Sequence, residues 1–425
     1  MRKVTYFLMR IFSGLWRHPD FLKLWAGQTV SLFGSQITLL ALPLTAVVTL
    51  QASTLDMGWL RFATTLPALL FGLIIGIWID RLRRRAMLIF ADLGRALLLG
   101  SIPLAAFLHL LSMPMLYVVS FLTGFLTLLF DVSAMSYLPS LIERKDLIEG
   151  NGKLEVSRSG ALIAGPSVAG LLVQLVSAPF AILADAVSFL VSVLSLVWIH
   201  RPEPRPVSEQ QPAPFWSELR VGLYFIRDQP VLRVIVISLA FFNFFSSALL
   251  SLYVIYVVRA LGVTPASLGL IYGIGSIGFL LGAGLVKPIT ERIGIGQAIL
   301  WGAFLCDGGY LLILLAHGSP LLIILLLIAA QLVTSFGGPV TAIAQGSYRQ
   351  AITPAQLQGR VNGANRFFAS CLSPAGALIG GALGVALGLQ WAMIVVIIGL
   401  QMGAFIFLLS PIRKVYDVPN AHPAQ

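Results

Sequence analysis

The chain has few residues of the kinds that enzymes and secreted domains use for active sites and cross-links. Of its 425 residues, 11% are charged, two are cysteines and five are histidines. Two cysteines cannot form a disulfide framework, and neither the histidines nor the acidic residues show the spacing of a metal site. The phosphate-binding motif G-x-x-x-x-G-K-[S/T] is also missing, which argues against direct use of ATP. We therefore expect no metal, no cofactor and no enzymatic activity.

Long apolar runs make up most of the chain, since 58% of the residues are hydrophobic. A helix of about 20 such residues crosses the hydrocarbon core of a bilayer and satisfies its own backbone hydrogen bonds there. The sequence therefore predicts an all-α integral membrane protein with twelve transmembrane helices. The expected spans are 23–50, 57–80, 86–108, 114–139, 153–176, 179–199, 231–258, 267–289, 296–316, 320–345, 363–388 and 390–410.

Basic residues gather at one side of this predicted bundle. They precede the first span and follow the even-numbered spans, as Arg84, Arg144 and Arg201 do, whereas only Arg61 and Arg259 lie near odd-numbered loops. Because cytoplasmic loops retain basic residues, both termini are expected in the cytoplasm. The net charge of +11 then reflects membrane topology, so we expect a lipid bilayer around the protein and no nucleic-acid partner.

A polar segment divides the chain near its middle. Residues 201–214 are rich in proline and read as a linker, and an apolar stripe after them predicts an amphipathic helix. The stripe consists of Phe215, Leu219, Leu223 and Ile226. We therefore divide the chain into a cytoplasmic segment (1–22), a six-helix bundle (23–200), a cytoplasmic linker with a helix (201–230), a second six-helix bundle (231–410) and a cytoplasmic tail (411–425).

The two bundles also repeat in sequence. Positions near the fifth and eleventh spans carry the same residue at a separation of 211 residues, as Gly165 and Gly376 do, and Gly170 and Gly381. Several matches at one separation predict a duplicated six-helix unit with pseudo-twofold symmetry. Twelve helices suffice for one transport unit, so we expect a monomer.

The loop after the second span resembles the G-x-x-x-D-R-x-G-R-R signature of the major facilitator superfamily, with Arg83 in place of its glycine. The resemblance covers nearly the whole chain and implies two six-helix bundles. It also implies a gate at the cytoplasmic side, where the carboxylate of Asp131 in the fourth span would pair with the loop arginines. The matching signature residues are Gly76, Asp80, Arg81, Arg84 and Arg85.

Gly165, Pro166 and Gly170 are similar to the G-P-x-x-G-G segment of antiporters in that superfamily, although Ala169 replaces one glycine. Small residues there also suit ordinary helix packing. Fragments 19–28, 91–96 and 358–363 resemble the drug:proton antiporter-3 group, which includes exporters of macrolides and siderophores. The arginine motif that many antiporters carry in the fourth helix is missing here.

Ionisable groups inside a membrane are costly and mark candidate sites for proton coupling. Three carboxylates qualify: Asp131, Asp185 and Asp307. Asp185 has no evident partner nearby in the sequence and is the preferred proton carrier, whereas Asp131 is favoured as a gate residue. Asp92 and Arg95 are three residues apart, as are Glu155 and Arg158, so each can pair with the other or with neighbours, and both sets are expected to be structural.

By analogy with the superfamily, the first, fourth, seventh and tenth helices would line a central cavity. Their polar residues are the candidate cargo contacts, together with Arg61 near the outer side of the second helix, which is equally suited to reach lipid headgroups. These residues are Ser35, Gln36, Thr127, Asn243, Ser246, Gln331 and Thr334.

Together these features predict a secondary transporter in a bacterial cell membrane. We expect it to export an amphipathic small molecule, a drug or a siderophore, by alternating access driven by a proton gradient. An importer or lipid flippase with the same fold is the alternative. An integral-membrane transferase is less favoured, because the acidic residues are scattered rather than clustered.

Overall fold

The computed structural model describes residues 14–72, 75, 79, 82–201, 203 and 215–416, with the backbone alone for 215–219. Within these ranges every regular element is a helix, which confirms the all-α fold class. The first bundle contains α2 (Pro19–Leu44), α3 (Thr54–Phe71), α5 (Arg84–Phe107), α6 (Met113–Leu141), α7 (Leu147–Val176) and α8 (Ala178–Val197).

The linker helix α9 (Phe215–Asp228) leads into the second bundle. That bundle contains α10 (Pro230–Ile255), α11 (Pro265–Gly275), α12 (Ile277–Ile293), α13 (Ile295–Gly309), α14 (Leu311–Leu314), α15 (Pro320–Ile352), α16 (Gln358–Cys371), α17 (Ser373–Leu387) and α18 (Leu389–Leu409). Three of its spans are interrupted, so that α11 with α12, α13 with α14, and α16 with α17 each form one crossing.

Eleven helical segments of the described part are long and apolar enough to cross a membrane. They match every predicted span except the second, where α3 ends at Phe71 and several of the next residues lie outside the described part. α3 begins at a capping box, in which Ser53 Oγ accepts a hydrogen bond from the Asp56 N–H at 3.1 Å and the Asp56 carboxylate accepts one from the Ser53 N–H at 2.8 Å. The Tyr117 hydroxyl donates to the same carboxylate at 2.8 Å and joins α6 to α3.

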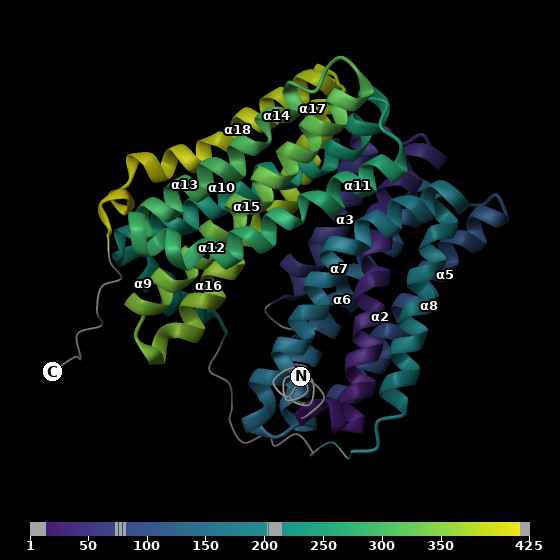
Figure 1. Ribbon diagram of the computed structural model, residues 1–425, viewed down its shortest axis with the longest axis horizontal. Coiled ribbons are helices and arrows are strands. Elements are labelled where there is room, and N and C mark those ends of the chain that lie inside the picture. The colour runs from purple at the N-terminus through teal and green to yellow at the C-terminus, as the bar shows by residue number, and fades with distance from the viewer. Residues whose placement is uncertain are drawn as a thin grey trace, which may run out of the picture.

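The two bundles form a V in Figure 1, in which the purple-to-teal helices make one arm and the green-to-yellow helices the other. The arms meet at one end, here called the far end, and diverge toward the other, the terminal end, where α2 begins and α18 ends. The linker helix packs at the terminal end of the second arm, with Gly222 against the backbone of Arg360 and Ile226 buried.

Candidate functional site

Two helix crossings between the arms close the far end. Gly58 of α3 lies against Gly381 of α17, and Gly170 of α7 lies against Gly269 of α11. Under the repeat of 211 residues these are the same contact, because Gly58 corresponds to Gly269 and Gly170 to Gly381. A Cβ atom added to Gly381 would lie 2.8 Å from the Thr54 carbonyl oxygen and 3.0 Å from the Gly58 Cα. The absence of side chains therefore allows the backbones to touch.

Hydrogen bonds across the same end join the arms outside these crossings. Arg259 Nη2 donates to the Val47 carbonyl at 3.1 Å, and Gln174 Oε1 accepts from the Ala266 N–H at 3.2 Å. Arg259, one of the two basic residues near odd-numbered loops, is thus a bridge between the arms.

The antiporter-like segment contacts helices of both arms. The Gly165 backbone receives the side chain of Gln36 in α2, since a Cβ on Gly165 would lie 2.6 Å from the Gln36 Cβ. Pro166 and Gly170 instead face Gly269 in the other arm. The sequence repeat contained the signal for Gly58 and Gly269, which the sequence reasoning missed because it compared only the fifth and eleventh spans.

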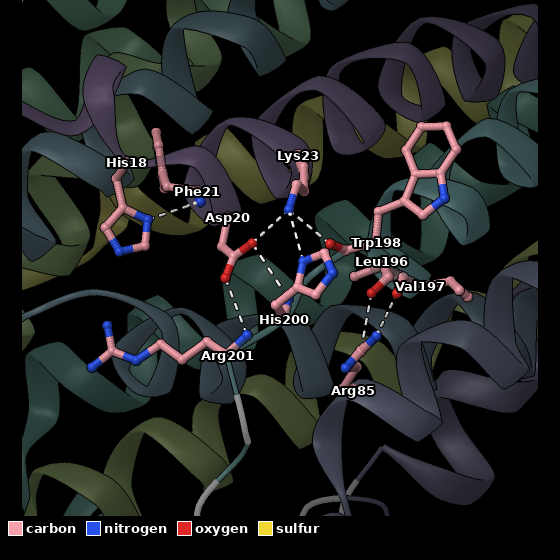
Figure 2. Close-up of polar contacts among 10 residues, drawn as sticks. All are labelled: His18, Asp20, Phe21, Lys23, Arg85, Leu196, Val197, Trp198, His200 and Arg201. Carbon is pink, nitrogen blue, oxygen red and sulfur yellow. Dashed lines mark hydrogen bonds and ion pairs between the residues drawn. The ribbon is translucent and has the colours of Figure 1, made fainter.

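At the terminal end, the last two arginines of the signature, Arg84 and Arg85, form contacts within their own arm. Arg85 donates to the last carbonyls of α8, with Nε 2.9 Å from Leu196 O and Nη2 2.7 Å from Val197 O (Figure 2). The Glu203 carboxylate accepts from the N–H groups of Arg84 at 2.7 Å and Arg85 at 3.2 Å. A cation at a helix C-terminus and an anion at an N-terminus both stabilise the helix. Gly76, Asp80 and Arg81 lie outside the described residues.

Asp20, at the start of α2, extends this cluster. Its carboxylate accepts from Lys23 Nζ at 2.8 Å and from the N–H groups of His200 at 3.3 Å and Arg201 at 3.1 Å (Figure 2). The Arg201 guanidinium donates to the Leu141 carbonyl at the end of α6, at 2.7 Å. α2, α6 and α8 are thereby tied at one point, which favours movement of this arm as one body.

Asp131 is exposed in α6 about 15 Å from the terminal end of that helix, at 1.5 Å per residue. It lies within electrostatic range of Arg158 in α7 and of Arg366 in α16, both exposed. Since Arg366 belongs to the other arm, Asp131 faces the gap between the arms. Its expected partner Arg81 is not described, so the pairing with the loop stays a prediction.

A buried polar network occupies the first arm between α5, α6 and α8. Asp92 and Arg95 form an ion pair, as the sequence predicted, with side chains that are 0% and 4% exposed. The Arg95 guanidinium lies over the rings of Phe130 and Phe189, 4.4 and 4.1 Å from their centroids. Among described residues no ion pair joins Glu155 to Arg158.

Asp185 lies in this network and is 1% exposed. The expectation that it lacks a local partner is wrong, because Ser188 Oγ donates to its carboxylate at 3.1 Å and Arg95 is within electrostatic range. The second arm has a less connected carboxylate. Asp307 of α13 is 3% exposed, its Oδ1 receives no hydrogen bond, and no basic side chain in the described ranges pairs with it.

The candidate cargo residues are distributed over α2, α6, α10 and α15. Thr334 is buried, and the others are half-buried: Ser35, Gln36, Thr127, Asn243, Ser246 and Gln331. Some of these polar groups form hydrogen bonds within the protein. Asn243 Nδ2, for example, donates to the Leu239 carbonyl at 2.8 Å. Arg61 is within electrostatic range of Tyr272 in the other arm, and its Nε has no hydrogen-bond partner. It therefore faces the second arm.

Known proteins resemble this chain in sequence and in fold. The family model of the Major Facilitator Superfamily matches residues 24–375 and 236–424. The multidrug efflux pump Tap of Mycolicibacterium fortuitum is 29% identical, over 88% of this chain and 91% of its own length. Macrolide efflux protein A of Streptococcus pyogenes is 23% identical, over 64% of this chain and 68% of its own.

Solved structures resemble the arrangement of the arms. A bacterial homologue of the iron transporter ferroportin in its inward-facing state is 16% identical and superimposes with a TM-score of 0.73, covering 93% of this chain and 99% of that one. Its outward-facing state gives 0.57, with 17% identity over 92% and 98%. The chain thus superimposes better on the inward-facing state of that homologue than on its outward-facing state. With a family model that matches from residue 24 to residue 424, this chain belongs to the Major Facilitator Superfamily.

Proposed function

We propose that this transporter exports an amphipathic small molecule, a drug or a siderophore, by alternating access in exchange for protons. The observation that carries the proposal is the pair of equivalent glycine crossings at the far end, while charges of both arms stay exposed toward the terminal end. Such a V, open at one end, is one of the two states that alternating access requires. The similarity to the efflux pump Tap supports export.

The terminal end would face the cytoplasm, because the basic residues gather there. Cargo would enter between the arms and contact the polar residues of α2, α6, α10 and α15. Closing this end would bring Asp131 toward Arg366. Opposite charges at about 4 Å attract by about 4 kcal/mol at an effective dielectric constant of 20, so this pair would favour the closed terminal end. Protonation of Asp131 would remove the attraction.

Transport in liposomes tests the proposal. Purified protein is reconstituted with an imposed pH gradient, and macrolides, dyes and catechol siderophores are screened. Cargo movement opposite to the proton flux supports proton-coupled export, whereas movement with the protons supports an importer. Movement of lipid probes alone supports a flippase. Lack of any gradient-dependent flux for all three cargo classes contradicts the proposal.

The charge pair has its own test. Asp131→Arg and Arg366→Asp should each slow transport at least tenfold, because each places like charges across the gap. The double variant should recover most of the flux, since it restores an opposite pair. Glu143→Gln, an exposed change at the same end, serves as a control. A double variant as slow as either single one would reject the pairing.

A further inference from the structure

Arg95 lies among carboxylates from three helices. It is paired with Asp92 on its own helix and lies within electrostatic range of Asp185 on α8 and Asp131 on α6. Neither Asp92 nor Arg95 was expected to do more than stabilise the fold. Their position between an exposed and a buried carboxylate suggests another role.

The guanidinium is held in a place that water cannot easily enter. Arg95 is 4% exposed, and the rings of Phe130 and Phe189 lie within 4.4 Å of its central carbon. A cation over aromatic rings is attracted to their faces, most strongly where water is excluded. Arg95 is therefore a fixed positive charge around which the carboxylates are arranged.

The buried charges do not balance. Asp92 and Asp185 are 0% and 1% exposed, and in the described part of the chain Arg95 is the basic side chain within electrostatic range of both. The other neighbours are hydroxyls of Thr38 on α2 and of Ser188 and Ser192 on α8. An ionised carboxylate buried without a cation is costly, and two carboxylates near one cation disfavour double ionisation. One proton restores neutrality.

We propose that Asp92 and Asp185, with Arg95 between them, form a binding site for one proton. In the loaded site one carboxyl group is protonated and the other is paired with Arg95. Release leaves both carboxylates ionised and sharing the guanidinium. Asp131 is exposed on α6 and within electrostatic range of Arg95, while Arg158 and Arg366 face it from α7 and α16. The role of this proton in transport rests on the proposed function; its binding does not.

Proton counting on the purified full chain, without cargo, tests the site. Acidification with an indicator dye measures protons taken up, and infrared difference spectra report the protonated carboxyl groups. Acidification should add one carboxyl signal to the wild-type spectrum that both Asp92→Asn and Asp185→Asn lack, because each variant leaves one carboxylate for one arginine. Carboxyl groups elsewhere, Asp307 among them, contribute equally to every protein. Arg95→Gln should gain two. Glu143→Gln, outside the network, should retain the wild-type signal.

The variants that keep a single carboxylate show whether one residue binds the proton or the pair shares it. If Asp92→Asn keeps the carboxyl signal, Asp185 binds the proton alone and the shared site is wrong. If the wild type shows no carboxyl signal on acidification, that result alone refutes the proposed proton site. Since Asn closely matches Asp in shape, size-exclusion profiles of these two variants should match the wild type even if Arg95→Gln misfolds.

The outcomes for the site and for the proposed function are separate. Carboxyl signals that follow the predicted pattern, with no pH-driven cargo flux, would keep the proton site and reject proton-coupled export. pH-driven flux together with a signal that survives in both Asn variants would keep export and reject this site.

Discussion

Alanine in place of Gly381 should weaken closure of the far end. The added Cβ would lie 2.8 Å from the Thr54 carbonyl oxygen, 3.0 Å from the Gly58 Cα and 3.2 Å from the Leu55 Cα. Carbon atoms prefer separations of about 3.5–4.0 Å, and backbone atoms cannot rotate away as side chains do. α17 and α3 would have to separate, at a cost of about 1–3 kcal/mol for an overpacked contact.

This cost applies only while the far end is closed. In the state with an open far end, α3 and α17 would be apart and the methyl group would meet no backbone. A difference of about 1–3 kcal/mol between two states changes their ratio by roughly 5- to 150-fold. The variant should therefore shift the population toward an open far end.

Distances between spin labels measure this shift. His109 and His317 are exposed in the turns that follow α5 and α14, one in each arm, and accept labels after substitution by cysteine. Because α5 and α13 begin at the terminal end, these turns lie at the far end. Cys306 and Cys371, the only native cysteines, are first replaced by alanine. Double electron–electron resonance should show a larger long-distance component in the Gly381→Ala protein than in its parent.

Matched glycines provide the controls. Gly363→Ala changes the same span, but nothing lies within 4 Å of the added Cβ, so the distance distribution should not move. Gly170→Ala alters the symmetric crossing and should produce the same shift as Gly381→Ala. If Gly381→Ala gave the distribution of Gly363→Ala, the far-end contact would not control opening.

Four further changes test the polar contacts. Arg85→Gln should lower the free energy of unfolding in detergent by about 1.5–3 kcal/mol, because it removes charge-assisted hydrogen bonds to the end of α8. An unchanged melting curve would show that water replaces these hydrogen bonds. Asp56→Ala should cost about 0.5–2 kcal/mol through loss of the α3 cap, and Tyr117→Phe should cost less, since it leaves the cap intact. Arg259→Gln should lengthen the label distance at the far end, though less than Gly381→Ala, and no change would limit Arg259 to a surface role.

The spans were predictable because lipid forces every crossing segment to be apolar and helical. The Asp92–Arg95 pair was predictable because its residues are three apart on one helix. Contacts between distant segments were not. The surroundings of Asp185 include Arg95 on α5, and Arg366 approaches Asp131 from the other arm, so neither is visible in local spacing. Gly58 and Gly269 could have been found from the repeat, since they share its separation.

The linker is anchored on both of its sides. Asp20 and the start of α5 hold His200, Arg201 and Glu203 against the first arm, and Gly222 of α9 rests on the second. Only the chain between residues 203 and 215 is left to span the distance between these anchors, and its full contour is about 40 Å at roughly 3.3–3.6 Å per residue. The linker therefore acts as a tether with a fixed maximum length. However far the arms rotate during a cycle, their terminal ends cannot separate beyond that length unless an anchor is released.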